Sequence, residues 1–309
     1  MKNKSLILLV FCLMLFTNNR VHALECDKNT YVNIHGVEMT CEQLNNLQNL
    51  GFNEKEIMHM DQEEFDANKY LFGEVVAETV KYYKTTTYYP NNSNLLSINN
   101  SEPISVSEEI NFEEYEQGNN IVEIKPNGLS NGYTETAYKR MTTTIINLGS
   151  NYRYKNTVNW KQEPTVKNYD IIGIGIEQSK VYGISSTKYI KSLYSYNTNN
   201  ACYDTTTTSG TWTLGADGYS VKFKVPYTSN YGTFGELYAY MYFNVDKSSS
   251  NTINVLNAYG NYRHATSNFT NTTFSFSITA LGIISIGGSY DNKYDSISTA
   301  QATWTGLNW

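Results

Sequence analysis

Cysteine, proline and histidine are scarce in this chain of 309 residues, which contains four, five and four of them. Five prolines are too few for a proline-rich stalk. No Cys-x-x-Cys pair occurs, so we do not expect a zinc site built on paired cysteines. Only His35, His59 and His264 follow the N-terminal segment. His35 and His59 are not at the spacing of a metal-binding pair, and we expect both on the surface.

The motifs of common enzymes are absent as well. The sequence has no Gly-x-Ser-x-Gly elbow, no His-Glu-x-x-His helix and no phosphate-binding glycine loop. The glycine-rich stretch 282–288 lacks the lysine of such a loop and indicates a bent strand. We therefore predict no catalytic residue, no metal site and no cofactor.

Three weaker alternatives for chemistry stay open. Cys202 with His264 would form the nucleophile and base of a cysteine hydrolase. Residues 291–295 offer two carboxylates to calcium, although an acidic turn is the better interpretation. A glycoside hydrolase needs two facing carboxylates. The candidates for such a pair are Asp170, Glu177, Asp204 and Glu236.

The chain has a single pronounced apolar run, residues 6–16, with Lys2 and Lys4 before it and Val21-His22-Ala23 after it. This pattern predicts a signal peptide over residues 1–23. The run is too short to cross a membrane, which disfavours a retained anchor. No later segment resembles a transmembrane helix, and we see no cell-wall sorting tail. We therefore expect a secreted, extracellular protein without a transmembrane segment after signal cleavage.

Cleavage after Ala23 leaves three cysteines, Cys26, Cys41 and Cys202. An odd number leaves one thiol unpaired. Cys26 and Cys41 bracket a short loop, and we predict a disulfide between them, which would stabilise the fold by about 3 kcal/mol in the chain-entropy model. Cys202 is then a buried free thiol or an intermolecular one.

Charge is unevenly distributed along the chain. Residues 24–132 contain 19 Asp and Glu but only 6 Lys and Arg, whereas residues 133–309 contain 10 and 14. The acidic part either docks onto the mildly basic part or forms a solvated linker, and the sequence supports the two interpretations equally. The basic residues of 133–309 are dispersed, so we expect no nucleic-acid partner.

Residues 24–70 carry the signals of a small helical unit. Thr40 with Gln43 forms a capping box, and Leu44, Leu47 and Leu50 follow at helical spacing. Gly51 then ends this helix. Asn53 with Glu56 and Asp61 with Glu64 predict two further short helices. So small a unit needs the Cys26–Cys41 bond or a docking surface to be stable.

Residues 71–132 read as an acidic strand and linker region. Lys81–Tyr89 is rich in threonine and tyrosine, which favours a strand. The remainder is rich in Asn, Ser and Glu and cannot bury enough apolar surface to fold alone. We place the domain boundary near residue 130.

Residues 133–309 predict an antiparallel β-sandwich, because about ten short alternating segments follow one another with turn residues between them. Tyr152–Trp160 places Tyr152, Tyr154, Val158 and Trp160 on one face. Tyr169–Glu177 has isoleucines on one face and Gly173 and Gly175 on the other, which allows another backbone, a sheet or a ligand to approach closely. Together these two segments predict the centre of a sheet. Gly215-Ala-Asp-Gly218 predicts a hairpin turn.

Trp160, Pro164 and Tyr169-Asp170-Ile-Ile-Gly173, together with the segment 31–65, resemble a group of uncharacterised secreted proteins of Gram-positive-type bacteria. The resemblance covers about a quarter of the chain. It implies secretion and a two-part layout, and it implies no activity and no site residue.

Aromatic side chains are the remaining candidates for function. Tyr238, Tyr240 and Tyr242 share one strand face, and Trp304 and Trp309 lie near the end of the chain. Sugar rings stack on such side chains, although a tyrosine stripe is more often packed against another layer. We predict a non-enzymatic binding or cell-surface interaction protein, with a cell-surface glycan or protein as its partner. The alternative is a β-rich pore-forming or membrane-damaging secreted protein, in which 134–146 and 270–280 would line an amphipathic hairpin.

Overall fold

The structure, a computed structural model, describes residues 30–89, 104–118, 122–124, 133–197, 202–227, 233–269 and 273–309. The predicted signal peptide and Cys26 lie outside these residues, so the signal and the Cys26–Cys41 bond stay predictions. The chain divides into two compact units between Glu74 and Val75. Each unit is described by itself.

The N-terminal unit begins with two short antiparallel strands, β1 (Thr30–Val32) and β2 (Glu38–Thr40), and continues with three short helices. The helices are α2 (Cys41–Asn49), α3 (Glu54–Met58) and α4 (Gln62–Asn68). Each helix begins at the cap that the sequence predicts. Thr40 and Asn53 form complete capping boxes, and the Asp61 side chain accepts a hydrogen bond from the Glu64 backbone N–H at 2.9 Å.

The helices of this unit bury the predicted apolar stripe, since Leu44, Leu47 and Leu50 are at most 1% exposed. Gly51 follows the first helix with a φ of +74°, the left-handed conformation that glycine adopts most easily. The prediction for His59 was wrong. His59 caps the C-terminal end of α3 and is buried, with its ring edge-on to His35 at a centroid distance of 6.1 Å.

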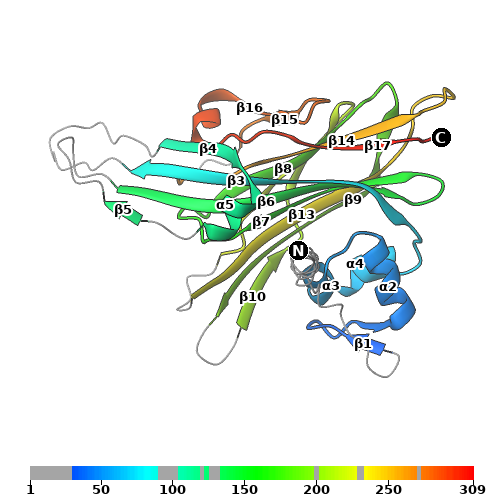
Figure 1. The fold of residues 1–309 in the computed structure, drawn as a ribbon, viewed down its shortest axis with the longest axis horizontal. Coiled ribbons are helices and arrows are strands. Elements are labelled where there is room, and N and C mark those ends of the chain that lie inside the picture. Colours follow the sequence, from blue (N-terminus) through cyan, green and yellow to red (C-terminus); the bar gives the residue numbers. More distant parts are fainter. Residues whose placement is uncertain are drawn as a thin grey trace, which may run out of the picture. The chain divides into compact units, whose positions relative to one another are not determined.

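The second unit consists mainly of two antiparallel sheets, drawn in Figure 1. The larger sheet has the strand order β10-β9-β13-β7-β6-β3-β4, with β5 also pairing with β6. Its strands are β3 (Glu74–Tyr89), β4 (Ile104–Ile110), β5 (Val122–Ile124), β6 (Tyr133–Asn147), β7 (Tyr152–Trp160), β9 (Val181–Asn197), β10 (Cys202–Thr207) and β13 (Thr233–Lys247). The smaller sheet has the order β11-β12-β8-β14-β17. Its strands are β8 (Tyr169–Ile176), β11 (Thr211–Gly215), β12 (Gly218–Lys224), β14 (Val255–Arg263) and β17 (Ala300–Thr305).

The two sheets enclose one hydrophobic core, as in a β-sandwich. Tyr154 and Trp160 of β7 and Ile172 and Ile174 of β8 belong to this core and are at most 2% exposed. The alternation in both segments therefore predicted the buried faces correctly. The two segments lie in different sheets, however: β7 lies between β13 and β6, and β8 between β12 and β14. The sequence predicted that both segments lie at the centre of one sheet. Instead, each lies inside its own sheet, and the two sheets face each other across the core.

A third layer covers part of the smaller sheet. The hairpin of β15 (Phe276–Ile278) and β16 (Ile284–Ile286) packs with Ile171 of β8 in a second hydrophobic cluster. A Cβ atom built on Gly175 would lie 2.5 Å from the Gly282 nitrogen and 2.5 Å from the Thr279 oxygen. The close approach of another backbone, predicted from these glycines, is thus confirmed: the turn of the hairpin lies directly over Gly175.

The strand predicted at Lys81–Tyr89 is part of β3, whereas β4 forms within the residues predicted as a linker, and both strands belong to the larger sheet. Tyr83 of β3 is 1% exposed and its hydroxyl donates to the Ser298 carbonyl at 2.7 Å. Polar side chains face each other across β3 and β4, with Thr85 and Ser107 joined at 2.8 Å. A composition that resembles a linker can therefore form a strand pair when its polar groups bond across the sheet, and the compact unit begins at Val75 instead of near residue 130.

A short helix follows β4 and also docks on the sandwich. This helix, α5 (Phe112–Gln117), begins at Asn111, whose side chain accepts from the Glu114 backbone N–H at 2.8 Å. Beyond its end, the Gly118 carbonyl accepts a hydrogen bond from the Gln162 side chain at 3.1 Å. The acidic segment of the chain is thus held to the β unit by specific bonds at this point.

Candidate functional site

A surface pocket of 530 Å³ lies at one end of the smaller sheet. Aromatic rings and lysines line it together, and no acidic side chain is among its lining residues. The lining consists of Lys167, Asn168, Lys224, Asn268, Phe269, Ser289, Tyr290 and Lys293. The lining residues are contributed by the loop before β8, the end of β12, the loop after β14 and η2 (Gly288–Lys293), a short 3-10 helix.

Buried contacts hold these loops in place. The Asn168 side-chain amide donates to the Phe269 carbonyl at 3.2 Å, and the Asn168 carbonyl accepts from the Val225 N–H at 2.9 Å. The Tyr290 ring stacks on Phe274 at a centroid distance of 4.7 Å and meets Phe269 edge-on at 5.6 Å. The aromatic wall of the pocket is therefore anchored by its own ring cluster, while part of each ring stays accessible.

The charge of the pocket is positive. Lys167 is partly balanced by Glu163, 2.8 Å away, just outside the lining. Asp291 of η2 is paired with Arg263 at 2.9 Å instead of with a lining lysine. Lys224 is exposed. The arrangement offers ammonium groups beside aromatic faces and amide groups, which together suit an anionic ligand with an apolar face.

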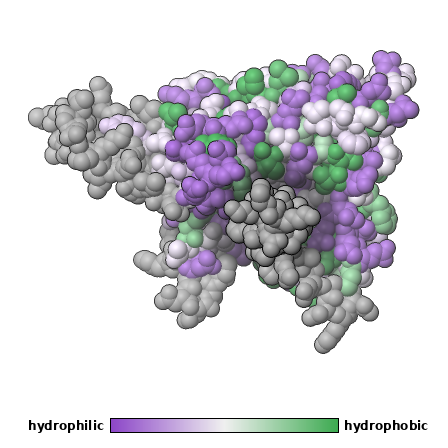
Figure 2. Space-filling model, viewed as in Figure 1, coloured by the Kyte–Doolittle hydropathy of each residue, from purple (hydrophilic) through white to green (hydrophobic). Residues whose placement is uncertain are grey.

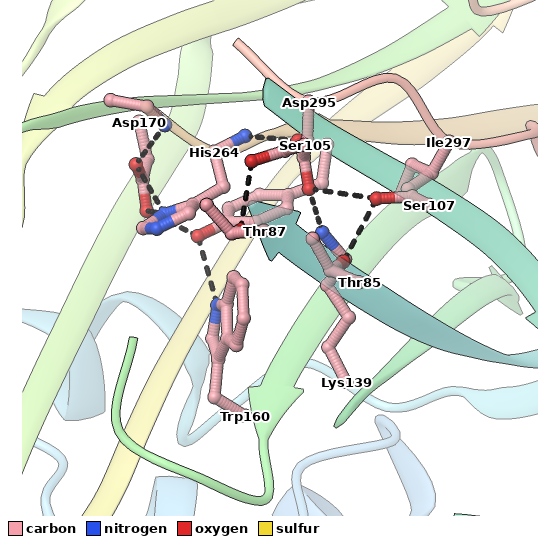
Figure 3. A network of polar contacts seen from close by, with 12 residues as sticks. Thr85, Thr87, Ser105, Ser107, Lys139, Trp160, Asp170, His264, Asp295 and Ile297 are labelled. Atoms are coloured by element: carbon pink, nitrogen blue, oxygen red, sulfur yellow. Dashed lines mark hydrogen bonds and ion pairs between the residues drawn. The ribbon is translucent and has the colours of Figure 1, made fainter. Parts of the chain in front are cut away.

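A second cluster of polar side chains lies buried in the β unit (Figure 3). Asp170, the second residue of the apolar strand β8, accepts a hydrogen bond from the Ala265 N–H at 3.1 Å and contacts the Nδ1 atom of His264 at 2.9 Å. The Tyr262 hydroxyl also donates to Asp170, and it accepts from the Trp160 indole N–H at 3.1 Å. All these side chains are at most 4% exposed.

Burial and the nearby carboxylate of Asp170 raise the pKa of Tyr262 well above its ordinary value. The phenol therefore stays protonated at neutral pH and acts as a hydrogen-bond donor. Burial, with a smaller contribution from Asp170, raises the pKa of Tyr294 in the same direction. This half of the cluster thus combines the Asp170 side chain with neutral phenols, away from solvent.

Lys139 and Asp295 form the other half of this cluster, and Figure 3 shows their side chains directed at each other. The Lys139 Nζ atom contacts the Asp295 carboxylate directly. The second carboxylate oxygen, Oδ1, accepts from the His264 backbone N–H at 2.7 Å, and the Ser107 hydroxyl lies 3.4 Å from Oδ2. Asp295, which the sequence placed in an acidic turn, is therefore a buried partner of a buried lysine.

The predicted tyrosine stripe lies on the face of β13 that points away from the sandwich core. Tyr238, Tyr240 and Tyr242 are only 3%, 1% and 3% exposed. The Arg153 guanidinium lies 4.3 Å from the Tyr242 ring centre, and the Lys155 ammonium 5.3 Å from that of Tyr240. Stacking of a ligand on these rings requires exposed faces, a condition that this structure does not meet. Binding at these tyrosines stays a prediction.

Trp304 and Trp309 are half-buried and pack against the sandwich core. The Trp309 ring meets Tyr152 edge-on at 4.9 Å, and the Trp309 backbone pairs with Ile253. The structure therefore does not bring the two tryptophans together with the tyrosine stripe of β13, and a role of either in binding stays a prediction.

The residues weighed for catalysis are dispersed. The Cys202 side chain lies outside the described residues, while His264 is bound to Asp170. The four carboxylates are distributed over both sheets and their ends. Among them, Glu236 of β13 accepts from Asn159 at 2.7 Å, and Glu177 pairs with Lys180 at 2.8 Å.

In the described part of the chain, no group of three or more His, Cys, Asp and Glu side chains is arranged to hold a metal ion. No helix among the same residues has the length and apolar character needed to span a membrane.

No family model matches the chain, and no curated protein matches it. Among solved structures, a chain named BspA_C_WT has a TM-score of 0.26 and 6% identity, with 72% of this chain and 84% of that chain covered. The full-length major pilin SpaD from Corynebacterium diphtheriae has a TM-score of 0.25 and 8% identity, with 73% and 59% covered. A structure of infectious bursal disease virus, Gt strain, has a TM-score of 0.15, with 77% and 62% covered. Scores this low do not establish a shared fold.

Proposed function

We propose that this protein is an extracellular binding protein without enzymatic activity, and that the pocket at Phe269 and Tyr290 binds an acidic saccharide. The predicted signal peptide supports the location. The observation that carries the ligand class is the lining of the pocket, in which Lys167, Lys224 and Lys293 surround two aromatic rings and no carboxylate is present.

Each part of the lining matches one part of such a ligand. The apolar face of a sugar ring packs against an aromatic ring, and the asparagine amides and the serine hydroxyl bond to sugar hydroxyls. The lysine ammonium groups attract a carboxylate or sulfate substituent, which a neutral sugar does not have. A pocket of 530 Å³ accommodates one or two sugar rings.

An array of oligosaccharides that contains acidic sugars and their neutral counterparts tests this proposal. We expect binding to acidic sugars only, weakened by added salt because the lysines are solvent-accessible. Lys224→Gln should then lower the affinity without changing the melting temperature, since Lys224 is exposed. Tyr290→Ala should lower affinity by about 0.5–1.5 kcal/mol for the lost stacking.

Lys188→Gln is the matched control, because Lys188 does not line the pocket: it lies on β9 of the larger sheet, where it donates to the Ser185 carbonyl and contacts the Trp212 ring. This variant should bind like the unmodified protein. Failure of all acidic sugars to bind, or an equal loss of affinity in the Lys188 variant, would contradict the proposal.

Pore formation is the alternative function. β6, which contains the predicted membrane-lining segment 134–146, pairs with β7 from Lys139 to Asn147, and its Met141 and Ile145 side chains are buried in the core. On the face drawn in Figure 2, hydrophobic residues occur in small groups between hydrophilic ones in the described part of the chain. We expect no leakage of dye from liposomes, because β6 would have to leave the sheet first. Leakage would favour the alternative.

A further inference from the structure

We infer that Lys139 and Asp295 become joined by a covalent amide bond between their side chains, formed within the folded chain. The starting observation is the direct contact between the lysine Nζ atom and the carboxylate, with both residues 1% exposed. The inference concerns chemistry inside the protein and is independent of the proposed ligand.

The surroundings of Lys139 suit an amide nitrogen better than an ammonium ion. An ammonium group has three N–H donors. Among the described residues, Asp295 is its only hydrogen-bond acceptor, and its other close neighbours are ring faces: the Nζ atom lies 4.6 Å from the Trp160 ring centre and 5.7 Å from that of Tyr262. An amide nitrogen carries one hydrogen and no charge, so this apolar site disfavours it far less than an ammonium ion.

Asp295 is held so that its two oxygens have different roles. Oδ1 accepts the short hydrogen bond from the His264 N–H, at 2.7 Å, and is thereby polarised as a carbonyl oxygen. Oδ2 contacts Lys139 and has the Ser107 hydroxyl at 3.4 Å. A backbone donor aimed at one carboxyl oxygen is the arrangement that stabilises negative charge when a nucleophile adds to the carbon.

The bond forms in three steps that need no other reactant. One proton passes from the Lys139 ammonium to the Asp295 carboxylate, so that an amine faces a carboxylic acid. The amine lone pair attacks Cγ, and the negative charge that develops on Oδ1 is stabilised by the His264 N–H. A second proton moves from the nitrogen to the departing oxygen, the Cγ–Oδ2 bond breaks, and one water molecule leaves. Nothing is oxidised or reduced.

Two features of the fold favour this reaction. The sheet framework holds nucleophile and carboxyl group in contact, which replaces a bimolecular encounter by an intramolecular step. Burial excludes the bulk water that would hydrolyse the product. The bond would join β6 of the larger sheet to the segment before β17 of the smaller sheet, across 156 residues of chain.

Mass spectrometry of the intact, denatured protein tests the inference. We expect the mass to be lower than that of the sequence by one water molecule. After trypsin digestion, we expect a branched peptide in which the peptide that begins at Tyr294 is attached to the one that contains Lys139. The Lys139→Arg variant should have the full mass, because a guanidinium group does not replace the amine in this reaction.

The same digest contains an internal control. Lys180 and Glu177 are also in contact, at 2.8 Å, but they are about one-third exposed and should be recovered without a crosslink. The full intact mass, with the Lys139 and Asp295 peptides recovered separately, would overturn the inference. So would a water loss that maps to Asp217 before Gly218, where the chain can cyclise by itself.

Discussion

Gly260 of β14 lies against Thr143 and Asn156 of the larger sheet with no room for a side chain, and replacing it by alanine tests how the core is packed. A Cβ atom at this position would be 2.0 Å from the Thr143 hydroxyl oxygen and 2.7 Å from the Asn156 side-chain oxygen. Both residues are fully buried. Alanine is usually better than glycine in a strand, so propensity alone predicts a small gain in stability. The contacts predict the opposite.

The expected loss follows from what must move. The Asn156 amide donates to the Gly173 carbonyl of β8 at 3.2 Å and to the Asn261 carbonyl of β14 at 3.0 Å, so it joins the two sheets. Overpacking a core costs about 1–3 kcal/mol. Displacing Asn156 adds about 1–3 kcal/mol for a buried group left without its partner. We expect Gly260→Ala to lower the free energy of unfolding by about 2–6 kcal/mol and the melting temperature by roughly 4–24 °C for a unit of this size.

Urea unfolding of Gly260→Ala measures this loss, with two comparisons. Gly215→Ala is the matched control, since its Cβ would be 3.6 Å from the nearest atom, an ordinary contact, and we expect no loss. Adding Thr143→Ala to Gly260→Ala removes the closest clash and should restore part of the stability, a positive coupling in the double-mutant cycle. Melting of the Gly260 variant within about 2 °C of the unmodified protein would refute the reasoning.

Three further predictions follow from the fold. Tyr240→Ala should lower the free energy of unfolding by about 3 kcal/mol, as truncation of a buried aromatic residue does, and a loss below about 1 kcal/mol in a thermal melt would show that the ring is not structural. A fragment over 75–309 should melt cooperatively in circular dichroism, whereas 133–309 should not, because it lacks β3 and its core residue Tyr83; cooperative melting of the shorter fragment would restore the boundary near 130. Burial raises the pKa of Tyr262 and Tyr83 above 10.0, so their contribution to stability is complete below about pH 10 and is lost as the pH rises further; melting temperatures that stay constant from about pH 9 to 12 would contradict this.

Local patterns in the sequence predicted local structure well. The capping boxes at Thr40 and Asn53 depend on residues three positions apart, and both helices begin there. The turn between Gly215 and Gly218 joins β11 to β12 as predicted, because a two-residue hairpin loop sets its own register. Alternation likewise identified the inward faces of β7 and β8.

Arrangement over long distances could not be predicted in this way. Composition described the residues after Tyr89 as a linker, but the side chains that stabilise β4 do so only when paired with those of β3, as Ser107 is with Thr85. The sequence left open whether the tyrosines of β13 are exposed or covered by another layer, because the alternation of tyrosine with apolar residues along the strand is the same in both cases.

The buried polar cluster joins residues that are far apart in the sequence. Asp170 and His264 are separated by 94 residues, and Lys139 and Asp295 by 156. Its one local signal was Asp170, a carboxylate inside an otherwise apolar strand. The pocket at Phe269 and Tyr290 left no local signal, because it combines one to three residues from each of four separate segments.

The position of β17 in the chain has a consequence for folding. Ala300 and Ala302 of this strand are completely buried in the core, and β17 pairs with β14. Residues 75–299 on their own would therefore leave the edge of β14 and part of the core open to water. Pairings between strands so distant in sequence form slowly, and incomplete sheets with open edges associate with one another. Export through a membrane, which the signal peptide pattern predicts, would benefit from this delay, because the sandwich stays open until β17 has crossed as well.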